Sequence, residues 1–259
     1  MDNLEQFNHY RQFVFLKVAA NLRSEALQNY LSYLWWFIEP LLHMMTYYLV
    51  FSLLLSRALE NFVAFLLTGL IPYLWFSRSI THGMNSITLG RGLMMQVHLP
   101  KILLPTISVL FVAAKQCIVF SILLIFLILY GIHPGPTWIA FPLLILTELL
   151  FIFACCFMVS AAVPFLPDLK FLVTAGIQML LFCSGVFYNI DMIAPQYKKL
   201  FFCLNPMANF LHNYRQVLMY NSWPDWHALA IIASGSLTVI LIMMYVFRRL
   251  DHVYPRVVL

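Results

Sequence analysis

Six long runs of apolar residues, separated by shorter polar segments, dominate the pattern along the chain. They cover residues 33–55, 62–83, 104–130, 138–163, 171–188 and 228–247. About 20 apolar residues are enough for an α-helix to cross the hydrocarbon core of a bilayer. Backbone groups find no water there, so helices are the expected form. The pattern therefore predicts an all-α integral membrane protein with six transmembrane helices in a single domain, residues 1–259.

A different pattern precedes the first run. Between residues 4 and 26, apolar side chains recur at steps of three to four, and polar or basic side chains fill the positions between them. This spacing is typical of an amphipathic helix that lies in the plane of the lipid headgroups. An ordinary cytoplasmic lead-in segment is the alternative. We expect an interface helix at 4–26.

The segment before the last run contains two shorter apolar stretches. Residues 192–204 and 207–220 are each too short to span a bilayer, and the dipeptide Asn205-Pro206 separates them. We interpret them as two short re-entrant or interfacial helices at the outer mouth. A long loop with some apolar content is the alternative.

Charge and composition support a membrane location and predict an orientation. The chain is 63% hydrophobic and 10% charged, whereas soluble domains carry about 25% charged residues. With both termini in the cytoplasm, more basic residues lie inside than outside, as the positive-inside rule requires. The inside set is Arg11, Lys17, Arg23, Arg91, Lys101, Lys170, Arg248, Arg249 and Arg256, and the outside set is Arg57, Lys198, Lys199 and Arg215. The net charge of +5 is scattered between apolar runs, so it does not indicate nucleic-acid binding.

Motifs for catalysis are missing from the sequence. There is no Gly-x-x-x-x-Gly-Lys-Ser/Thr phosphate loop, no His-Glu-x-x-His, no Cys-x-x-Cys and no nucleophile elbow. The eight histidines are dispersed, which does not favour a metal site. We expect no catalytic residue, metal or cofactor in this chain, and any ATP hydrolysis must come from another subunit.

Polar and aromatic side chains share faces within several of the apolar runs. The first run places Trp36, Glu39, His43, Tyr47 and Phe51 on one helical face. The fifth run aligns Thr174, Gln178, Phe182, Gly185 and Asn189, and the second run aligns Phe65, Thr68, Pro72, Trp75, Ser79 and His82. Aromatic rings pack on the C–H faces of sugars and polar groups bind their hydroxyls, so such faces suit a polysaccharide path. Polar contacts that hold helices together are the alternative.

Two charged side chains lie deep within the apolar runs. Lys115 is in the third run and Glu148 is in the fourth, each near the middle. Because consecutive spans run antiparallel, the two side chains reach similar depths. A charge in lipid requires a partner. We expect a structural ion pair between Lys115 and Glu148.

The order and spacing of several short segments resemble a known family. The segments are Tyr33-Leu34-Trp35-Trp36-Phe37-Ile38-Glu39-Pro40-Leu41-Leu42-His43, Phe65-Leu66-Leu67-Thr68-Gly69-Leu70-Ile71-Pro72, Asn85-Ser86 with Gly92-Leu93, Pro100-Lys101 with Leu104-Pro105, Asp168-Leu169-Lys170 and Leu204-Asn205-Pro206-Met207-Ala208. Over nearly the whole chain, the sequence is similar to the permease subunits of polysaccharide ABC exporters, of the Wzm, KpsM and TagG type.

This resemblance implies a function and a set of roles. The chain would form a homodimer in the bacterial inner membrane, bind two copies of an ABC ATPase that holds ATP and Mg²⁺, and export a lipid-linked polysaccharide of O-antigen, capsule or teichoic-acid type. The first and fifth spans would line the channel, and the lipid anchor would enter near the interface helices. Residues 88–100 would contain the coupling helix, with Arg91, Met94, Met95 and His98, and residues 189–220 would form external gate helices.

Three other classes of membrane protein remain as alternatives. An ABC exporter of small drugs or lipids could use the same fold. An integral membrane transferase would need convergent catalytic groups, and the only candidate pair, Glu39 with His43, lacks a third orienting group. An ion-coupled transporter would usually show inverted repeats and broken helices, which the sequence does not show.

Overall fold

The computed structural model describes most of the chain outside the first apolar run. The described residues are 3–28, 61–96, 99–189, 200–202 and 204–258, together with residues 35, 38, 41–43, 45, 46, 49 and 50. Within these ranges the structure consists of helices, turns and bends, without a strand. Most of the predicted span 33–55 and of the first predicted gate helix, 192–204, therefore lies outside the described residues.

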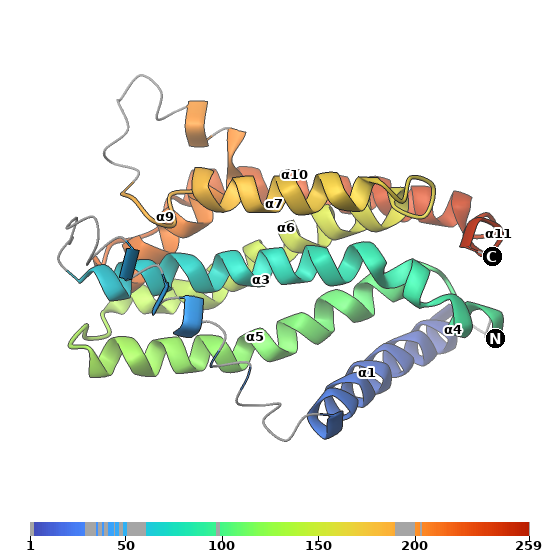
Figure 1. Ribbon diagram of the computed structural model, residues 1–259, viewed down its shortest axis with the longest axis horizontal. Coiled ribbons are helices and arrows are strands. Elements are labelled where there is room, and N and C mark those ends of the chain that lie inside the picture. Colours follow the sequence, from blue (N-terminus) through green and yellow to red (C-terminus); the bar gives the residue numbers. More distant parts are fainter. Residues whose placement is uncertain are drawn as a thin grey trace.

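The helices form an elongated bundle (Figure 1). They are α1 (Asn3–Gln28), α3 (Phe62–Leu89), α4 (Arg91–Gln96), α5 (Leu103–Leu129), the short 3-10 helix η2 (Pro136–Ala140), α6 (Phe141–Ala162), α7 (Leu169–Cys183), α9 (Pro206–Leu218), α10 (Trp226–Leu250) and α11 (Tyr254–Val258). Figure 1 shows α3, α5, α6, α7 and α10 along the long axis of the molecule. Helix α1 lies at an angle beside α5 and contacts it, near the end where α4 and both chain termini lie, and α9 lies toward the opposite end.

Four helical stretches of the described chain are long and apolar enough to cross a membrane. They are Phe62–Gln96, Leu103–Leu129, Pro136–Ala162 and Trp226–Leu250. They agree with the predicted spans 62–83, 104–130, 138–163 and 228–247. Helix α7 is also apolar, but its 15 residues reach only about 22 Å at 1.5 Å per residue. That length is below the thickness of about 30 Å that a spanning helix must cover.

Helix α3 is the centre of the bundle. Its side chains pack on α5, α6 and α9. The ring of Trp75 meets Phe120 edge-on, with 5.7 Å between ring centroids. Thr68 and Ser79 are fully buried on the same helix. The predicted polar-aromatic stripe of the second run therefore lies mainly inside the protein core rather than along a translocation path, because α3 is covered by neighbouring helices on nearly every side.

A second cluster of buried side chains closes the end of the bundle near the termini. It consists of Ile87, Leu104, Phe157, Ala161, Phe247 and Tyr254. Next to it, the ammonium group of Lys101 lies 3.2 Å from an Asp251 carboxylate oxygen, and the Lys101 backbone N–H donates to the other oxygen at 2.8 Å. These contacts fasten the start of α5 to the C-terminal end of α10.

Candidate functional site

Helix α7 belongs to the fifth run, which the family resemblance predicts to line the channel together with the first run. None of its residues is buried. Thr174, Gln178 and Phe182 are exposed, and the Phe182 ring is 58% exposed although it contacts Phe187 with 5.4 Å between centroids. The predicted channel residues Gln178 and Phe182 thus lie on a surface that the described residues leave open.

The end of α7 differs from the prediction. The helix stops at Cys183, not at residue 188, and Gly185 adopts a left-handed backbone with φ of 74°. A glycine accepts this conformation without the steric conflict that a Cβ causes. Gly185 and Asn189 therefore do not continue the Thr174–Gln178–Phe182 face, as the sequence pattern predicted.

Arg215 of α9 holds the backbone that follows α7. Its side chain is 3% exposed and donates from Nη1 to the Gly185 carbonyl at 2.7 Å, from Nη2 to the Val186 carbonyl at 2.9 Å and from Nε to the Phe65 carbonyl at 3.3 Å. Its guanidinium carbon lies 3.5 Å from the centroid of the Phe65 ring. Carbonyl dipoles and the ring face thus surround the buried charge.

A glycine on α3 makes room for this guanidinium. A Cβ added at Gly69 would lie 2.5 Å from Arg215 Nη2, which is closer than atoms can approach without a shift. Asn205 completes the arrangement, because its side chain accepts from the Ala208 N–H at the start of α9 and donates to the Cys183 carbonyl at 3.0 Å. Non-helical backbone within a membrane protein is tolerated when protein groups satisfy it. The turn after α7 meets this condition through Arg215 and Asn205.

The predicted ion pair between Lys115 and Glu148 is wrong. Lys115 Nζ lies 2.8 Å and 3.0 Å from the two carboxylate oxygens of Glu25, at the C-terminal part of α1. Glu148 is fully buried and accepts a hydrogen bond of 2.7 Å from the Tyr214 hydroxyl of α9. Helix α5 directs Lys115 toward α1, whereas α6 directs Glu148 toward α9.

Most of the candidate channel face of the first run lies outside the described residues. Trp36, Glu39, Tyr47 and Phe51 lie outside the described residues. His43 is described, and it is a half-buried helical residue. The proposed role of this face as one wall of the channel stays a prediction.

The candidate coupling segment is a short helix at the end where both termini lie (Figure 1). Helix α4 occupies Arg91–Gln96 within the predicted range 88–100, and His98 lies outside the described residues. Arg91 and Met95 are exposed, whereas Met94 is half-buried and packs against the buried cluster around Tyr254. Helix α4 contacts α11 and α3, so these two helices support the side of α4 that faces the protein.

Tyr254 belongs to the buried cluster against which α4 packs. Its side chain is fully buried and its ring lies 5.6 Å from Phe247 and 5.5 Å from Phe165, measured between centroids. Burial, with a smaller effect of the nearby Asp251 carboxylate, raises the pKa of Tyr254 to about 12. The phenol therefore stays protonated throughout the physiological pH range.

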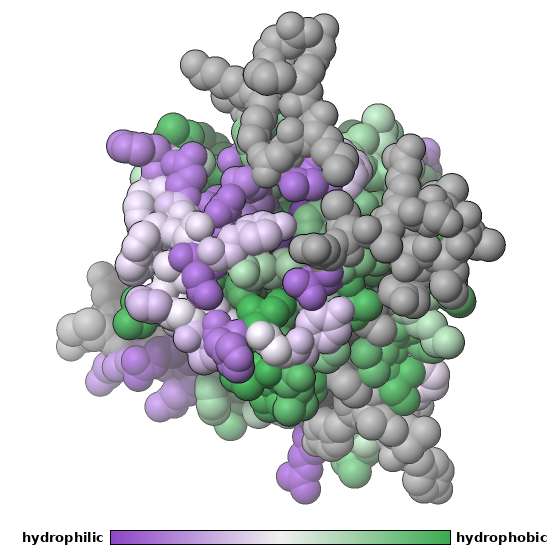
Figure 2. Space-filling view, turned by 90° about the vertical axis from the view of Figure 1, so that its left-hand side faces the viewer, coloured by the Kyte–Doolittle hydropathy of each residue, from purple (hydrophilic) through white to green (hydrophobic). Residues whose placement is uncertain are grey.

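The opposite end of the molecule has a mixed surface. Figure 2 looks onto the end that carries α9 and shows hydrophilic residues gathered on one side and hydrophobic residues on the other. Trp223 and Trp226 lie near this end, with 6.2 Å between their ring centroids, and both are exposed. Exposed tryptophans are typical of the boundary between lipid and water.

Sequence reasoning missed Arg215 and Tyr214 as internal contacts. It placed both in an outside segment, where a charge is expected to meet water. The strong apolar periodicity of 207–220 was the available signal, because it indicated that one face of α9 is buried.

No group of three His, Cys, Asp or Glu side chains that could hold a metal occurs in the described ranges.

Comparison with known proteins identifies relatives over most of the chain. Residues 14–219 match the model of the ABC-2 type transporter family. The chain is 28% identical over 240 residues to the O-antigen export system permease protein RfbA of Myxococcus xanthus, and the match covers 92% of each chain. It is 26% and 25% identical over 248 residues to two proteins of the same name from Klebsiella pneumoniae, with 95% of each chain covered.

Proposed function

Because this chain belongs to the ABC-2 type transporter family, we propose that it is the permease subunit of an ABC transporter that exports an O-antigen-type polysaccharide across the bacterial inner membrane. The observation that carries this proposal is the similarity over 92–95% of both chains to three proteins named as O-antigen export permeases. The long apolar helices and the exposed α4 and α7 support it.

The energy for export comes from a partner subunit in this proposal. Two copies of an ABC ATPase bind ATP and Mg²⁺ and dock on α4 of two permease chains. The exposed Arg91 and Met95 supply a charge and an apolar contact for docking. The contacts of α4 with α11 and α3 support a role in coupling, because a displacement of α4 is transmitted to the helices that it contacts.

The translocation path lies between two copies of the chain. The open face of α7, with Gln178 and Phe182, meets the first span around a two-fold axis, in keeping with the cyclic symmetry common among homodimers. The sugar chain slides along aromatic and amide side chains, and the lipid anchor enters near α1. Both termini face the cytoplasm, which fits their common location with α4 at one end of the bundle (Figure 1).

Coupling requires that the open and closed states bind nucleotide and substrate differently. ATP binding draws the two ATPase copies together and moves α4, and the movement passes through the start of α5 and through α11. The ion pair of Lys101 with Asp251 links the same region to α10. Each α7 face then moves away from the first span that it meets and opens the path. In this scheme the permease provides the channel and the ATPase provides the conformational work.

The proposal is tested by gene deletion, complementation and gentle purification from membranes. We expect the deletion strain to accumulate lipid-linked polysaccharide inside the cell, and the wild-type chain to restore its export. The purified protein should carry a phosphate-loop ATPase in equal amount. Normal polysaccharide export in the deletion strain, combined with drug-stimulated ATP hydrolysis by the purified complex, would show a drug or lipid exporter instead.

The channel face is tested with variants of α7. Gln178→Leu together with Phe182→Ala should lower export severalfold, while the partner ATPase continues to hydrolyse ATP. Leu241→Ala on the exposed side of α10 is the matched control, since that helix carries few buried residues. Equal export by the wild type and the α7 double variant contradicts the proposed path.

A further inference from the structure

A small polar cavity lies between the C-terminal part of α1 and the middle parts of α3 and α5. Its volume is about 260 Å³. Charged and polar side chains from all three helices line it: Glu25 from α1, Arg78 and His82 from α3, and Lys115 and Gln116 from α5. Ionisable side chains within the spans of a membrane protein commonly mark the route of a charged or polar substrate. The cavity is therefore a candidate binding site.

The cavity offers hydrogen-bond donors to an anion. Lys115 is 15% exposed, and Arg78 is half-buried. An ammonium group has three N–H donors and a guanidinium group has five, so each can bind an anion and keep a second contact. Both kinds of side chain bind phosphate groups through charge-assisted hydrogen bonds. This set of donors suits a phosphate group that has left bulk water.

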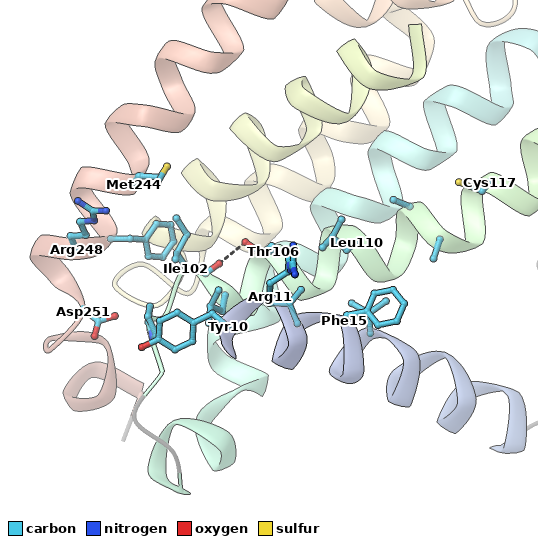
Figure 3. A pocket seen from close by; sticks show the side chains of 17 residues that line it. Tyr10, Arg11, Phe15, Ile102, Thr106, Leu110, Cys117, Met244, Arg248 and Asp251 are labelled. Carbon is cyan, nitrogen blue, oxygen red and sulfur yellow. Dashed lines mark hydrogen bonds between the residues drawn. The ribbon is translucent and has the colours of Figure 1, made fainter. Parts of the chain in front are cut away.

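A larger groove between α1, α5 and α10 has a different lining (Figure 3). Its volume is about 990 Å³, and apolar side chains such as Phe15, Leu110 and Met244 form most of its walls. Its two arginines, Arg11 of α1 and Arg248 of α10, lie apart in Figure 3. These two guanidinium groups do not form one site for a phosphate, whereas the charged groups of the polar cavity share a volume of about 260 Å³.

The Glu25 carboxylate occupies the position at Lys115 that a phosphate group would take. Lys115 Nζ lies 2.8 Å and 3.0 Å from the two Glu25 oxygens. Glu25 is 32% exposed and Lys115 is 15% exposed, so the carboxylate lies nearer the rim of the cavity. A phosphate group presents anionic oxygens of the same kind to an ammonium group. Exchange of one anion for the other keeps the partly buried lysine charge paired, which avoids the cost of an isolated charge.

The position of the cavity along the helices indicates which lipid brings a phosphate group there. The 27 residues of α5 extend about 40 Å at about 1.5 Å per residue, and Lys115 lies near their middle. The hydrocarbon core of a bilayer is about 30 Å thick, and resting phospholipids hold their phosphates at its two surfaces. A phosphate group reaches the middle of α5 with a lipid that is being moved.

The same cavity borders the proposed translocation path. Trp35 of the first run lines it together with the side chains of α1, α3 and α5. The first run is one of the two proposed channel walls, and the lipid anchor enters near α1 in the proposed function. The cavity therefore lies between the proposed entry and the proposed channel.

We propose that this cavity binds the phosphate group that joins the lipid anchor to the exported sugar chain. The phosphate replaces the Glu25 carboxylate at Lys115 and accepts further hydrogen bonds from Arg78. The binding chemistry is that of any lipid phosphate, and its assignment to the substrate's anchor rests on the proposed function and on the position of Lys115 along α5. The site holds the anchor beside the first span while the sugar chain passes along the channel.

The test uses the intact complex with its ATPase partner in nanodiscs of dioleoylphosphatidylcholine. The nanodiscs contain equal small amounts of undecaprenyl diphosphate, undecaprenol and dioleoylphosphatidylglycerol. After extraction into mild detergent, native mass spectrometry counts the lipids that stay bound to each permease chain. We expect about one undecaprenyl diphosphate per chain and little of the other two lipids, because undecaprenol has the same tail without the charge and phosphatidylglycerol keeps its phosphate at the bilayer surface.

Variants at the two ends of the ion pair should change retention in opposite directions. Lys115→Met removes the ammonium group and should lower retention of undecaprenyl diphosphate about tenfold, and so should Arg78→Gln. Glu25→Gln removes the competing carboxylate and should raise retention severalfold. Arg249→Gln removes a positive charge from the last turn of α10, outside the cavity, and is the matched control with unchanged retention.

This contrast separates binding from a structural role of the pair. If the pair served only to hold α1 on α5, Lys115→Met and Glu25→Gln would act alike, because each breaks the same contact. Size-exclusion chromatography identifies variants that unfold. A gain of retention in Glu25→Gln cannot come from unfolding, so the proposal stays testable even where the lysine variant is unstable.

Four results overturn the proposal. Unchanged retention in both Lys115→Met and Arg78→Gln removes the cavity as the site, and a loss of retention in Glu25→Gln assigns the pair a structural role only. Equal retention of phosphatidylglycerol assigns the cavity to a phospholipid of the bilayer, and equal retention of undecaprenol removes the role of the phosphate. All four leave the proposed function standing, because that function fails only when the deletion strain exports its polysaccharide normally.

Discussion

The contact between α1 and α5 provides a quantitative test of how the interface helix is held. Lys115 Nζ lies 2.8 Å from a Glu25 oxygen, and the two side chains are 15% and 32% exposed. Each single neutral variant loses the attraction between the two charges. The double variant loses the same attraction, so its loss of stability is smaller than the sum of the two single losses. A double-mutant cycle with Lys115→Met and Glu25→Gln therefore measures the interaction of this pair, separately from the other contacts of each side chain.

The size of the coupling follows from distance and exposure. At 2.8 Å and an effective dielectric constant of about 20, the attraction between unit charges is about 6 kcal/mol. Both groups lose hydration when they pair, and solvent reaches Glu25 and screens it. Exposed pairs contribute about 0.2–1 kcal/mol, whereas removal of one partner from a buried pair costs about 3–5 kcal/mol. We expect a coupling free energy of about 1–2 kcal/mol, between these limits.

The assay is unfolding of the purified protein in mixed micelles of dodecylmaltoside and sodium dodecyl sulfate, followed by circular dichroism. Each single variant should be less stable than the wild type, and the double variant should be less destabilised than the sum of the two. The cycle of Lys115→Met with Glu148→Gln is the control, and its effects should add within about 0.5 kcal/mol. A larger coupling of Lys115 to Glu148 than to Glu25 would refute the reasoning.

Three further predictions test packing, the turn after α7 and the coupling helix. Gly83→Ala places a Cβ 1.9 Å from Cys156 Sγ and should lower the free energy of unfolding by about 1–3 kcal/mol. Adding Cys156→Ala to the same chain should restore most of this loss in the same unfolding assay. No restoration would contradict the close approach of α3 and α6. Arg215→Met leaves the Gly185 and Val186 carbonyls without their donor, at about 1–3 kcal/mol for each buried acceptor, and should speed hydrogen exchange at residues 184–189, with Arg215→Lys intermediate. Met95→Asp on the exposed side of α4 should lower co-purification of the ATPase severalfold, whereas Tyr220→Asp at the other end should not; equal losses would remove α4 as the docking element.

The hydrophobic pattern predicted the long helices well, because the preference of a side chain for lipid is a local property. The spans at 104–130 and 138–163 agree with α5 and with η2 plus α6 within a few residues. Asn205-Pro206 was also a sufficient local signal for the start of α9, since the Asn205 side chain caps the helix and proline fits its first turn. Helical periodicity also predicted that Thr174, Gln178 and Phe182 share one face of α7, but it did not predict that the helix ends before Gly185.

The partners of the buried polar residues did not follow from the sequence. Depth along a span predicted a meeting of Lys115 with Glu148, but the direction in which each helix faces is fixed by packing with α1 and α9. Periodicity identified a polar-aromatic face on α3 and gave no information on what that face contacts. The early end of α7 depends on Arg215, about 30 residues later in the chain, and a local pattern contains no such distant contact.

The hydrogen bonds that Arg215 donates to the Gly185 and Val186 carbonyls also have a consequence for synthesis of the chain. A ribosome completes this turn 30 residues before it reaches the arginine, which takes a few seconds at about 5–20 residues per second. During that interval the two carbonyls need hydrogen bonds from water or from the insertion machinery. Nascent chains arrested after this turn has left the ribosome, but before Arg215 has left it, should therefore keep the turn at an aqueous boundary, and it should settle among the helices only after α9 has emerged.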